Sequence, residues 1–412
     1  MITYPLQPVA LELQAVNFRV LPPLSLYIHI PWCMRKCPYC DFNSHEVRTP
    51  SPLQGEGRDG GRLSALLEKQ YIAALIRDLE LALPRIWGRK VNTVFFGGGT
   101  PSLLSGESIA QLMCSVRMLL PLDINAEITL EANPGTVEAA RFAAYRDAGV
   151  NRLSMGIQSF NDAHLQALGR IHTAEEARRA IGIAQRHFDN INLDLMYALP
   201  GQTPDEAMQD VQTALSFAPQ HLSCYHLTLE PNTLFYRDPP ALPDDDASSE
   251  MQQRIEEMLA ANGYQHYETS AFAQPGFRAR HNLNYWMFGD YLGVGAGAHS
   301  KLSFPDKVMR QARYKQPQAY IQQAGKDAPV QSETEVSREE LGFEFMMNAL
   351  RLTEGFNSVL FQEHTGSPLP GIRRELAEAE RRGLLTHDHQ RIAPTRLGQR
   401  FLNDLLEIFI RE

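Results

Sequence analysis

A strand–turn–helix rhythm repeats from residue 24 to residue 230 and leaves few folds open to this chain. The candidate strands are "LSLYIHI", "NTVFFGG", "AEITLEAN", "RLSMGIQ", "NINLDLMYALP" and "HLSCYHLTLE". Amphipathic helices separate them, as the spacing of Leu67, Tyr71, Leu75 and Leu79 indicates. Strands that alternate with helices form right-handed crossovers and a parallel sheet. We therefore expect an α/β fold, either an open, partial (β/α)6 barrel or a doubly wound sheet.

The chain divides into three expected parts: an N-terminal extension (1–23), a barrel domain (24–310) and a C-terminal domain (311–412). Within the barrel, residues 49–62 are rich in Pro and Gly and poor in large apolar side chains. That composition predicts a disordered insertion. Near the end, "IRRELAEAERRGLLTHDHQRIAPTRLGQRFLNDLL" predicts a helix, a two-stranded wing and another helix. This is a helical, winged-helix-like outline.

The charge balance argues against a nucleic-acid partner. The formal net charge is -9, and residues 336–412 hold 10 Lys and Arg against 12 Asp and Glu. No apolar run is long enough to span a bilayer, and the first residues lack the pattern of a secretory signal. The five cysteines, three of them clustered, do not resemble a disulfide framework. We expect a cytoplasmic protein.

Three cysteines stand close together in the stretch "YIHIPWCMRKCPYCDF". Cys33, Cys37 and Cys40 follow the spacing C-x3-C-x2-C, and no fourth cysteine is near. A structural zinc site normally takes four ligands, whereas a cubane iron–sulfur cluster held by three thiolates keeps one iron open for a small molecule. Cys114 and Cys224 are expected to be buried apolar residues. An alternative is a zinc-stabilised DNA-binding regulator, against which the acidic charge and the missing fourth ligand count.

Polar or Gly-rich segments follow successive strands, where parallel α/β sheets bind ligands. They contain the following candidates: Gly98, Gly99 and Thr100 in "GGGTPS", Glu131 in "TLEANP", Gln158 in "GIQSF", Arg170 in "LGRIHT" and Asp194 in "NLDLMYALPGQT". Each alone has a bland explanation as a turn, cap or surface group. "GVGAG" at 293–297 has no clear strand–helix context, so we interpret it as a close-packed turn.

With Tyr39 before the third cysteine, the cysteine motif resembles the signature of radical S-adenosylmethionine (SAM) enzymes. The resemblance implies a [4Fe–4S] cluster on Cys33, Cys37 and Cys40, whose open iron chelates SAM. The reduced cluster then splits the sulfonium to give a 5′-deoxyadenosyl radical. It also implies SAM contacts from Tyr27, Tyr39 and the strand-end candidates, with Glu131 accepting hydrogen bonds from ribose hydroxyls.

The motifs "YIHIPWC…CPYCDFNS", "FFGGGTPSLL", "LEANPGT", "RLSMGIQSFND", "DLMYALPGQT" and "HNLNYW" are together similar to the oxygen-independent coproporphyrinogen III oxidase family. The oxidases carry a further cysteine two residues after the third, where this chain has Phe42. They also carry a longer N-terminal extension. Both departures match the sister branch of haem chaperones, HemW. The resemblance therefore implies a haem chaperone, and the alternative is a radical SAM enzyme acting on coproporphyrinogen III or a related porphyrinogen.

In the chaperone interpretation, "HNLNYW" is the haem motif. His281 would offer a neutral imidazole to haem iron, and Tyr285 and Trp286 would lie against the porphyrin. Arg278 and Arg280 would meet the propionates. The alternative is a β-edge packed under the C-terminal domain. The expected partners are haem and acceptor haemoproteins, including membrane-associated ones, together with a second copy of the chain in a homodimer.

Overall fold

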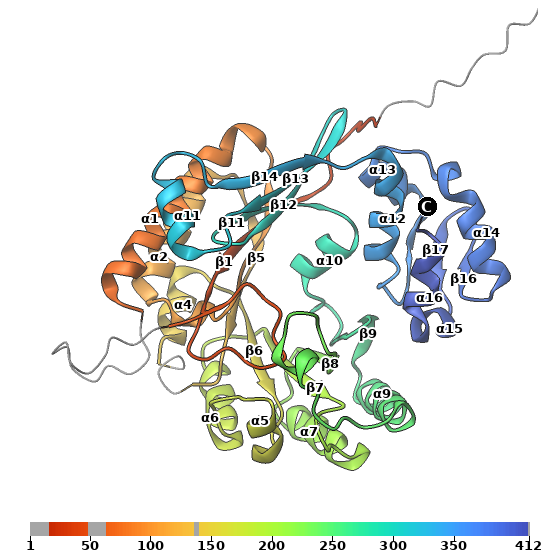
Figure 1. Cartoon of the computed structure of the whole chain (residues 1–412), viewed down its shortest axis with the longest axis horizontal. Helices are drawn as coiled ribbons and strands as arrows, with labels where there is room; N and C mark the ends of the chain where they lie inside the picture. The colour runs from red at the N-terminus through yellow and green to blue at the C-terminus, as the bar shows by residue number, and fades with distance from the viewer. Residues whose placement is uncertain (1–15, 48–62, 136–139, 411–412) are drawn as a thin grey trace, which may run out of the picture. The chain divides into compact units, whose positions relative to one another are not determined.

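The computed structural model describes residues 16–47, 63–135 and 140–410, and the chain forms two compact units (Figure 1). The larger unit contains residues 23–302 and 310–334, and the smaller contains the described residues before 23 together with 303–309 and 335–410. The expected insertion at 49–62 and residues 1–15 of the expected extension lie outside the described residues.

Six parallel strands form the centre of a 12-stranded sheet in the larger unit. They are β1 (Leu24–Ile30), β4 (Val91–Gly98), β5 (Leu122–Ala132), β6 (Arg152–Gln158), β7 (Ile191–Tyr197) and β8 (His221–His226). Each strand lies beside the next in the chain, without the reversal of order that a doubly wound sheet requires. The partial (β/α)6 barrel is confirmed, and the doubly wound alternative is wrong.

Six further strands extend the sheet at its two ends. Outward from β1, the sheet continues with β11 (Asp290–Val294), β12 (His299–Phe304), β13 (Lys307–Arg313) and β14 (Val330–Glu335). Outward from β8, it continues with β10 (Ala271–Ala273) and then β9 (Gln265–Glu268). The expected domain boundary after residue 310 falls inside β13. Residues 310–334 group with the barrel because β13 and β14 belong to its sheet.

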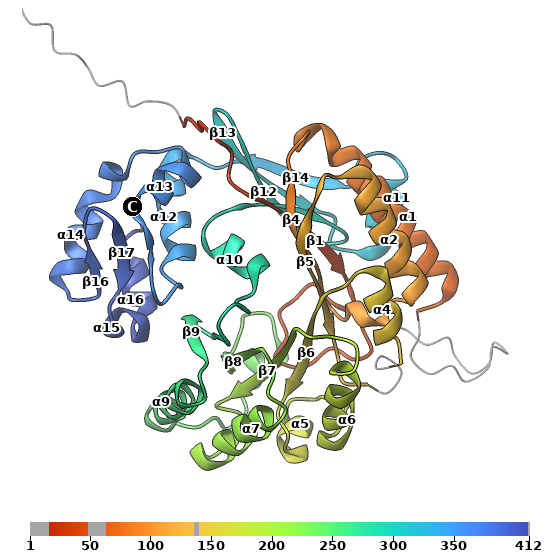
Figure 2. The same ribbon diagram turned by 180° about the vertical axis from the view of Figure 1, so that it is seen from behind.

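Helices cover the outer face of the sheet in both views (Figures 1 and 2). They include α1 (Ala65–Ala82), α2 (Gly106–Leu119), α4 (Phe142–Ala148), α6 (Ala174–Ala184), α7 (Pro204–Ser216) and α9 (Asp245–Ala261), and shorter elements are α5 (Asp162–Ala167), α8 (Leu234–Arg237) and α11 (Pro317–Ala324).

The alternation along β1 decides which side chains enter the barrel. Leu24, Leu26, Ile28 and Ile30 are fully buried and share one face, as the period of two in a strand requires. The residues between them, among them Tyr27, face the inside. The interior is accordingly lined with polar and aromatic groups.

The smaller unit contains the predicted helices and two-stranded wing, and a further short strand makes its sheet three-stranded. Its elements are α12 (Arg338–Ala349), β15 (Phe356–Asn357), α13 (Ser358–Thr365), α14 (Arg373–Arg381), β16 (Leu385–His387), β17 (Arg391–Pro394), α15 (Arg396–Arg400) and α16 (Leu402–Glu407). The sheet has the order β15-β17-β16. Phe345 packs edge-on against Phe356 and Phe361 in its core.

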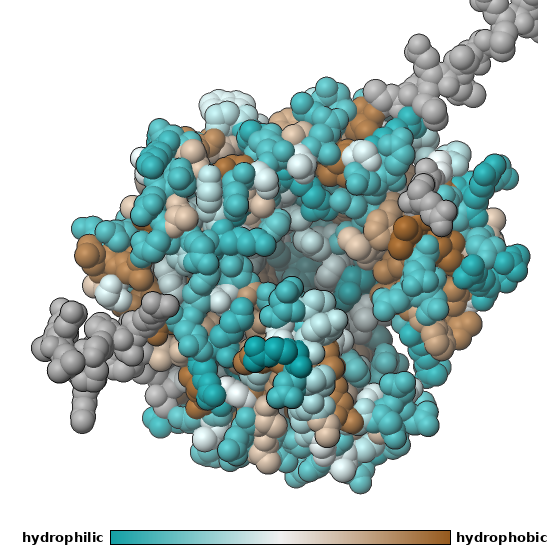
Figure 3. Space-filling model, in the orientation of Figure 1, coloured by the Kyte–Doolittle hydropathy of each residue, from teal (hydrophilic) through white to brown (hydrophobic). Residues whose placement is uncertain are grey.

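The visible surface is mainly hydrophilic, with hydrophobic residues in separate patches (Figure 3). Within the described ranges, no helix combines the length and apolar character needed to cross a membrane.

Candidate cofactor site

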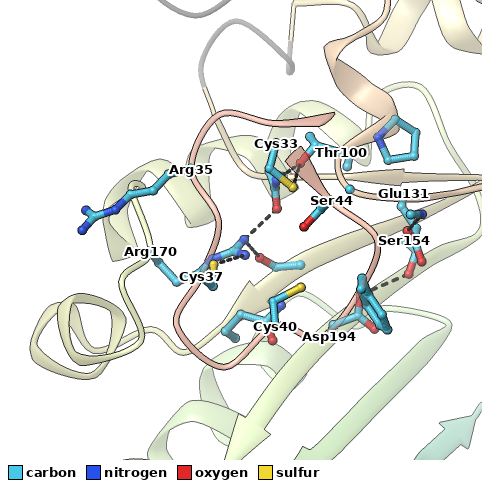
Figure 4. A pocket seen from close by; sticks show the side chains of 18 of the residues that line it. Cys33, Arg35, Cys37, Cys40, Ser44, Thr100, Glu131, Ser154, Arg170 and Asp194 are labelled. Atoms are coloured by element: carbon cyan, nitrogen blue, oxygen red, sulfur yellow. Dashed lines mark hydrogen bonds between the residues drawn. The ribbon is translucent and has the colours of Figure 1, made fainter. Parts of the chain in front are cut away.

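The three clustered cysteines lie on one loop at the carboxyl end of β1. Strand β2 (Trp32–Cys33) pairs with β3 (His45–Glu46), so the loop returns beside its own start. The Cys40 N–H donates to the Cys37 carbonyl at 3.2 Å. All three thiols line the same pocket (Figure 4). Burial raises the thiol pKa of Cys33 and of Cys40, so both thiols stay neutral unless a cationic centre binds them.

Most of the predicted cofactor residues line this pocket. They are Tyr39, Gly98, Gly99, Thr100, Glu131, Gln158, Arg170 and Asp194. Chain segments from β4, β5, β6 and β7 thus converge with the cysteine loop at the carboxyl ends of the strands, where the sequence places them. Tyr27 and the haem-motif residues His281, Tyr285 and Trp286 do not line it.

Neighbouring protein atoms leave no room for a side chain at Gly98 or Gly99 of "GGGT". A Cβ on Gly99 would lie 2.5 Å from the Trp32 carbonyl oxygen, and one on Gly98 would lie 2.6 Å from the His29 ring. Gly98 also has a φ of +115°, which favours glycine. The absence of side chains therefore lets β4 approach the first residues of the cysteine motif.

Arg170 organises one wall of the pocket. Its guanidinium donates to the Asn133 side-chain oxygen at 2.7 Å and to the Gly156 carbonyl at 2.8 Å, and it lies 3.8 Å from the Cys37 sulfur. Asn133 in turn donates to the Thr100 hydroxyl, which lies 3.5 Å from the Cys33 sulfur. The cation beside the Cys37 sulfur and the hydroxyl beside the Cys33 sulfur would both stabilise thiolates.

Two carboxylates occupy the opposite part of the pocket. Burial and the charge of Asp194 raise the pKa of Glu131 to about 8, although the Gly98 N–H donates to it at 3.2 Å. Burial also raises the pKa of Asp194, which accepts hydrogen bonds from Asn192 at 2.8 Å and from Ser154 at 3.2 Å. Both groups are suited to accept hydrogen bonds from hydroxyls.

Gln158 ends β6 in an unusual conformation. Its φ is +70°, rare for a residue with a side chain, and the register of β6 against β7 shifts between Gly156 and Gln158. The irregularity places Gln158 among the pocket-lining residues.

Tyr27 contacts His29 on its own strand, β1, and Phe95 on the neighbouring strand, β4. Its hydroxyl lies 3.0 Å from Nδ1 of His29, and its ring stacks against Phe95 with centroids 6.2 Å apart. The residue is half-buried and does not line the pocket.

The haem motif forms a helix, α10 (Arg280–Trp286), so the β-edge alternative is wrong. His281 is buried, with Nδ1 2.8 Å from the Thr93 hydroxyl, and burial followed by the charge of Arg152 lowers its pKa to about 3. The Tyr285 and Trp286 rings meet at 87°. One flat macrocycle can therefore stack on one of these two rings, not on both.

The two arginines before the motif already have protein partners. Arg278 donates to the Gln265 side chain at 3.1 Å and lies over the Tyr267 ring, and Arg280 donates to the Asn125 carbonyl at 2.6 Å.

Several pocket residues were not predicted: Ser44, Asn133, Ser154 and Gly156. Asn133 follows Glu131 by two positions in "EAN", and Ser154 and Gly156 precede Gln158 at intervals of two. The alternation of a strand places such residues on one face, which is the signal that could have identified them. Cys114 was expected to be buried and is exposed, whereas Cys224 is buried as expected.

Among the described residues, no group of three or more His, Cys, Asp and Glu side chains is placed to hold a single metal ion. The three thiols nevertheless line one pocket. That arrangement is what a cluster of several irons requires, because each thiolate binds a different iron.

The fold is that of a radical SAM protein: the model of the radical SAM superfamily matches residues 27–214, and that of the HemN C-terminal domain matches residues 336–401. The protein named heme chaperone HemW from Escherichia coli K12 is 47% identical over 397 residues, which cover 95% of this chain and 99% of the relative. The protein of the same name from Bacillus subtilis 168 is 34% identical, over 94% of this chain and 99% of the relative. The chain belongs to the HemW family.

A solved structure supports the fold. That of coproporphyrinogen III oxidase (HemN) from Escherichia coli, described as a radical SAM enzyme, superposes with a TM-score of 0.77 at 24% identity. The match covers 94% of this chain and 90% of that one.

Radical SAM membership implies a [4Fe–4S] cluster and SAM, and the pocket fits both. Cys33, Cys37 and Cys40 would hold the cluster, while Glu131 and Asp194 would accept the hydroxyls of the nucleoside. When bound, the reduced cluster supplies the single electron that cleaves the sulfonium of SAM. Arg170 and Thr100 lie beside two of the sulfurs and would stabilise their anionic form.

Proposed function

We propose that this protein is a haem chaperone that binds a [4Fe–4S] cluster, SAM and haem, and delivers the haem to acceptor haemoproteins. The relationship to proteins of that name along almost the whole chain carries the proposal. Phe42 supports it, because it lines the pocket where the oxidase pattern has a further cysteine.

The hydrogen bonds of His281 support a role as haem ligand. The Thr93 hydroxyl donates to Ser25 at 2.8 Å, so it accepts from Nδ1–H of His281. Nε2 then carries the free electron pair. The low pKa keeps the imidazole neutral at physiological pH, which is the form that binds iron. Because His281 is buried, haem binding through it requires α10 to move.

Tyr285 is the better candidate for stacking on the macrocycle. It is 38% exposed, whereas Trp286 is more buried and perpendicular to it. Trp286 would then contact the edge of the porphyrin.

Anaerobic reconstitution followed by haem titration tests the proposal. We expect a Soret shift with a saturating 1:1 end point and retention of the cluster absorbance. The variant His281→Ala should lose most of the haem affinity and keep the cluster, whereas His164→Ala, a similarly buried histidine on α5, should keep both. Wild-type protein that takes up no haem would refute the proposal.

A second candidate function is radical chemistry on a porphyrinogen. The reason to consider it is that the thiols, the Arg170 network and both carboxylates are all present in one pocket. Reduced protein supplied with SAM and coproporphyrinogen III should then yield 5′-deoxyadenosine and a vinyl product. Absence of both products would exclude this activity for that substrate.

We further infer that the protein works in the cytoplasm, that some acceptors are membrane-associated and that the chain forms a homodimer. The five free cysteines support a reducing compartment. Fractionation of cells and light scattering with and without haem test these points. A haem-loaded protein that stays monomeric at micromolar concentration would contradict the homodimer.

A further inference from the structure

The "GVGAG" segment, interpreted from sequence as a close-packed turn, packs against the cysteine motif. A Cβ on Gly295 would lie 2.4 Å from the His29 carbonyl oxygen, and one on Gly297 would lie 2.2 Å from the Asn43 side chain. Both glycines also have positive φ values, +108° and +80°. The segment therefore makes room for two residues that flank the cysteines in sequence.

Asn43, three positions after Cys40, is attached at three points. Its amide donates to the Ala296 carbonyl at 3.0 Å and to the Lys315 carbonyl at 2.9 Å. Its own carbonyl accepts from Nε2 of His29 at 2.9 Å. These bonds connect the returning arm of the cysteine loop to β1 and to the chain after β11 and β13.

The tautomer of His29 follows from its partners. Because a carbonyl only accepts, Nε2 carries the proton, and Nδ1 of the neutral ring accepts from the Tyr27 hydroxyl. Burial lowers the pKa of His29, which keeps the ring neutral. Gly98 leaves the space that this ring occupies.

The buried Tyr71 bonds both to the chain before the cysteines and to the "GVGAG" segment. The Tyr71 hydroxyl donates to the His29 carbonyl at 2.7 Å and accepts from the Ala296 N–H at 2.9 Å. Three motifs that are distant in sequence, "YIHIPWC", "GGGT" and "GVGAG", thus meet at His29 and Asn43. Neither residue was among the predicted site residues, and Asn43 does not line the pocket.

We propose that Asn43 and His29 are positioning residues that hold the returning arm of the cysteine loop, and so fix where Cys40 meets the cluster. The inference rests on the cluster site of the proposed function but not on haem. Loss of the Asn43 amide should loosen the loop without unfolding the barrel.

The variant Asn43→Ala tests this, with Asn151→Ala as the matched control. Asn151 also donates to a backbone carbonyl, that of Ala126 at 2.8 Å, and accepts from the Ile128 N–H at 2.8 Å, but it lies at the other end of the strands. In apo-protein, amides 34–46 of Asn43→Ala should exchange hydrogen about five- to tenfold faster, the factor expected for the loss of about 1 kcal/mol of hydrogen bonding. Those of Asn151→Ala should be unchanged.

Reconstituted protein supplies the second readout. We expect Asn43→Ala to lose its cluster in air several times faster than wild type, with a changed EPR signal of the reduced form, at an unchanged melting temperature of the apo-protein. His29→Gln keeps an N–H near the position of Nε2 and should retain the wild-type signal, whereas His29→Ala should not.

Equal exchange, cluster lifetime and EPR signal in Asn43→Ala and Asn151→Ala would overturn the proposal. Failure of the wild type to assemble any cluster would instead refute the cofactor site itself, and the exchange measurement in apo-protein separates the two results.

Discussion

The raised pKa of Glu131 predicts a pH dependence of SAM binding. Glu131 shares the pocket with Asp194, and its pKa of about 8 makes it mostly protonated at neutral pH. The carboxylate accepts hydrogen bonds from the two ribose hydroxyls more strongly than the protonated acid, because a charged acceptor forms stronger hydrogen bonds than a neutral one. Lowering the pH should therefore weaken SAM binding.

The magnitude follows from the fraction ionised. With a pKa of about 8, the carboxylate form of Glu131 makes up roughly 1% at pH 6, roughly 10% at pH 7 and roughly 90% at pH 9. If only this form binds, Glu131 alone changes the association constant about tenfold between pH 6 and pH 7, and little above pH 9.

The variant Glu131→Gln isolates this contribution. The α-amino group of SAM also titrates, with a pKa near 8, and it adds the same slope to the wild type and the variant. Equilibrium dialysis with anaerobic, reconstituted protein from pH 6 to pH 9 should therefore give a steeper slope for wild type, by about one logarithmic unit per pH unit below pH 8. Equal slopes for both proteins would refute the reasoning.

The raised pKa of Glu131 also predicts how the stability of the apo-protein changes with pH. A carboxyl whose folded-state pKa is raised from 4.5 to about 8 stabilises the folded state below pH 4.5, and that contribution is lost as the pH rises to 8. Glu131→Gln should therefore gain stability relative to wild type over this window. A pH-independent difference would show that burial does not perturb Glu131.

The other predictions concern packing and ion pairs. Gly99→Ala should prevent cluster assembly and cost about 1–3 kcal/mol of stability, because the new Cβ would meet the Trp32 carbonyl. Gly182→Ala on α6, where nothing lies within 4 Å of the added Cβ, should slightly stabilise the folded protein. Equal melting temperatures of the two variants would contradict this prediction. Lys301→Met should cost about 1–3 kcal/mol in urea unfolding. It removes a fully buried ion pair with Asp290 at 2.9 Å, but Arg89, 2.8 Å from the other carboxylate oxygen, still pairs with Asp290. Lys90→Met, which removes the ion pair of the exposed Lys90 with Asp123, should cost less than about 1 kcal/mol of stability. A similar loss of stability in Lys301→Met and Lys90→Met would show that burial does not decide how much an ion pair contributes.

The parallel sheet and most of the pocket could be predicted because both depend on local patterns. Strands β1 and β6 have the bounds that the apolar segments predict, and polar residues after successive strands meet at one edge of the sheet. Cys114 lies in α2, whose buried side is formed by Ile109, Leu112, Met113 and Val116. Cys114 falls on the opposite side, and counting the helical period would have shown it.

Other features depend on partners that are distant in the chain. Nothing in the sequence near Tyr27 indicates that His29 binds its hydroxyl, or that Asn43 is bound by Lys315, 272 positions away. The domain boundary expected after residue 310 falls inside β13 for the same reason, because β13 and β14 join a sheet begun by β1.

An open sheet has two outer strands, here β14 and β9, that a closed barrel would not have. Unpaired backbone at such an edge invites another chain to add a strand and aggregate. The chain counters this at β14, where five of six residues are exposed and polar, and Glu333 binds Arg85 through both carboxylate oxygens. β9 is only four residues long. The charge of β14 and the short length of β9 oppose the pairing of one incomplete barrel with another, so neutral or apolar substitutions in β14 would favour fibres before they affected the cofactor pocket.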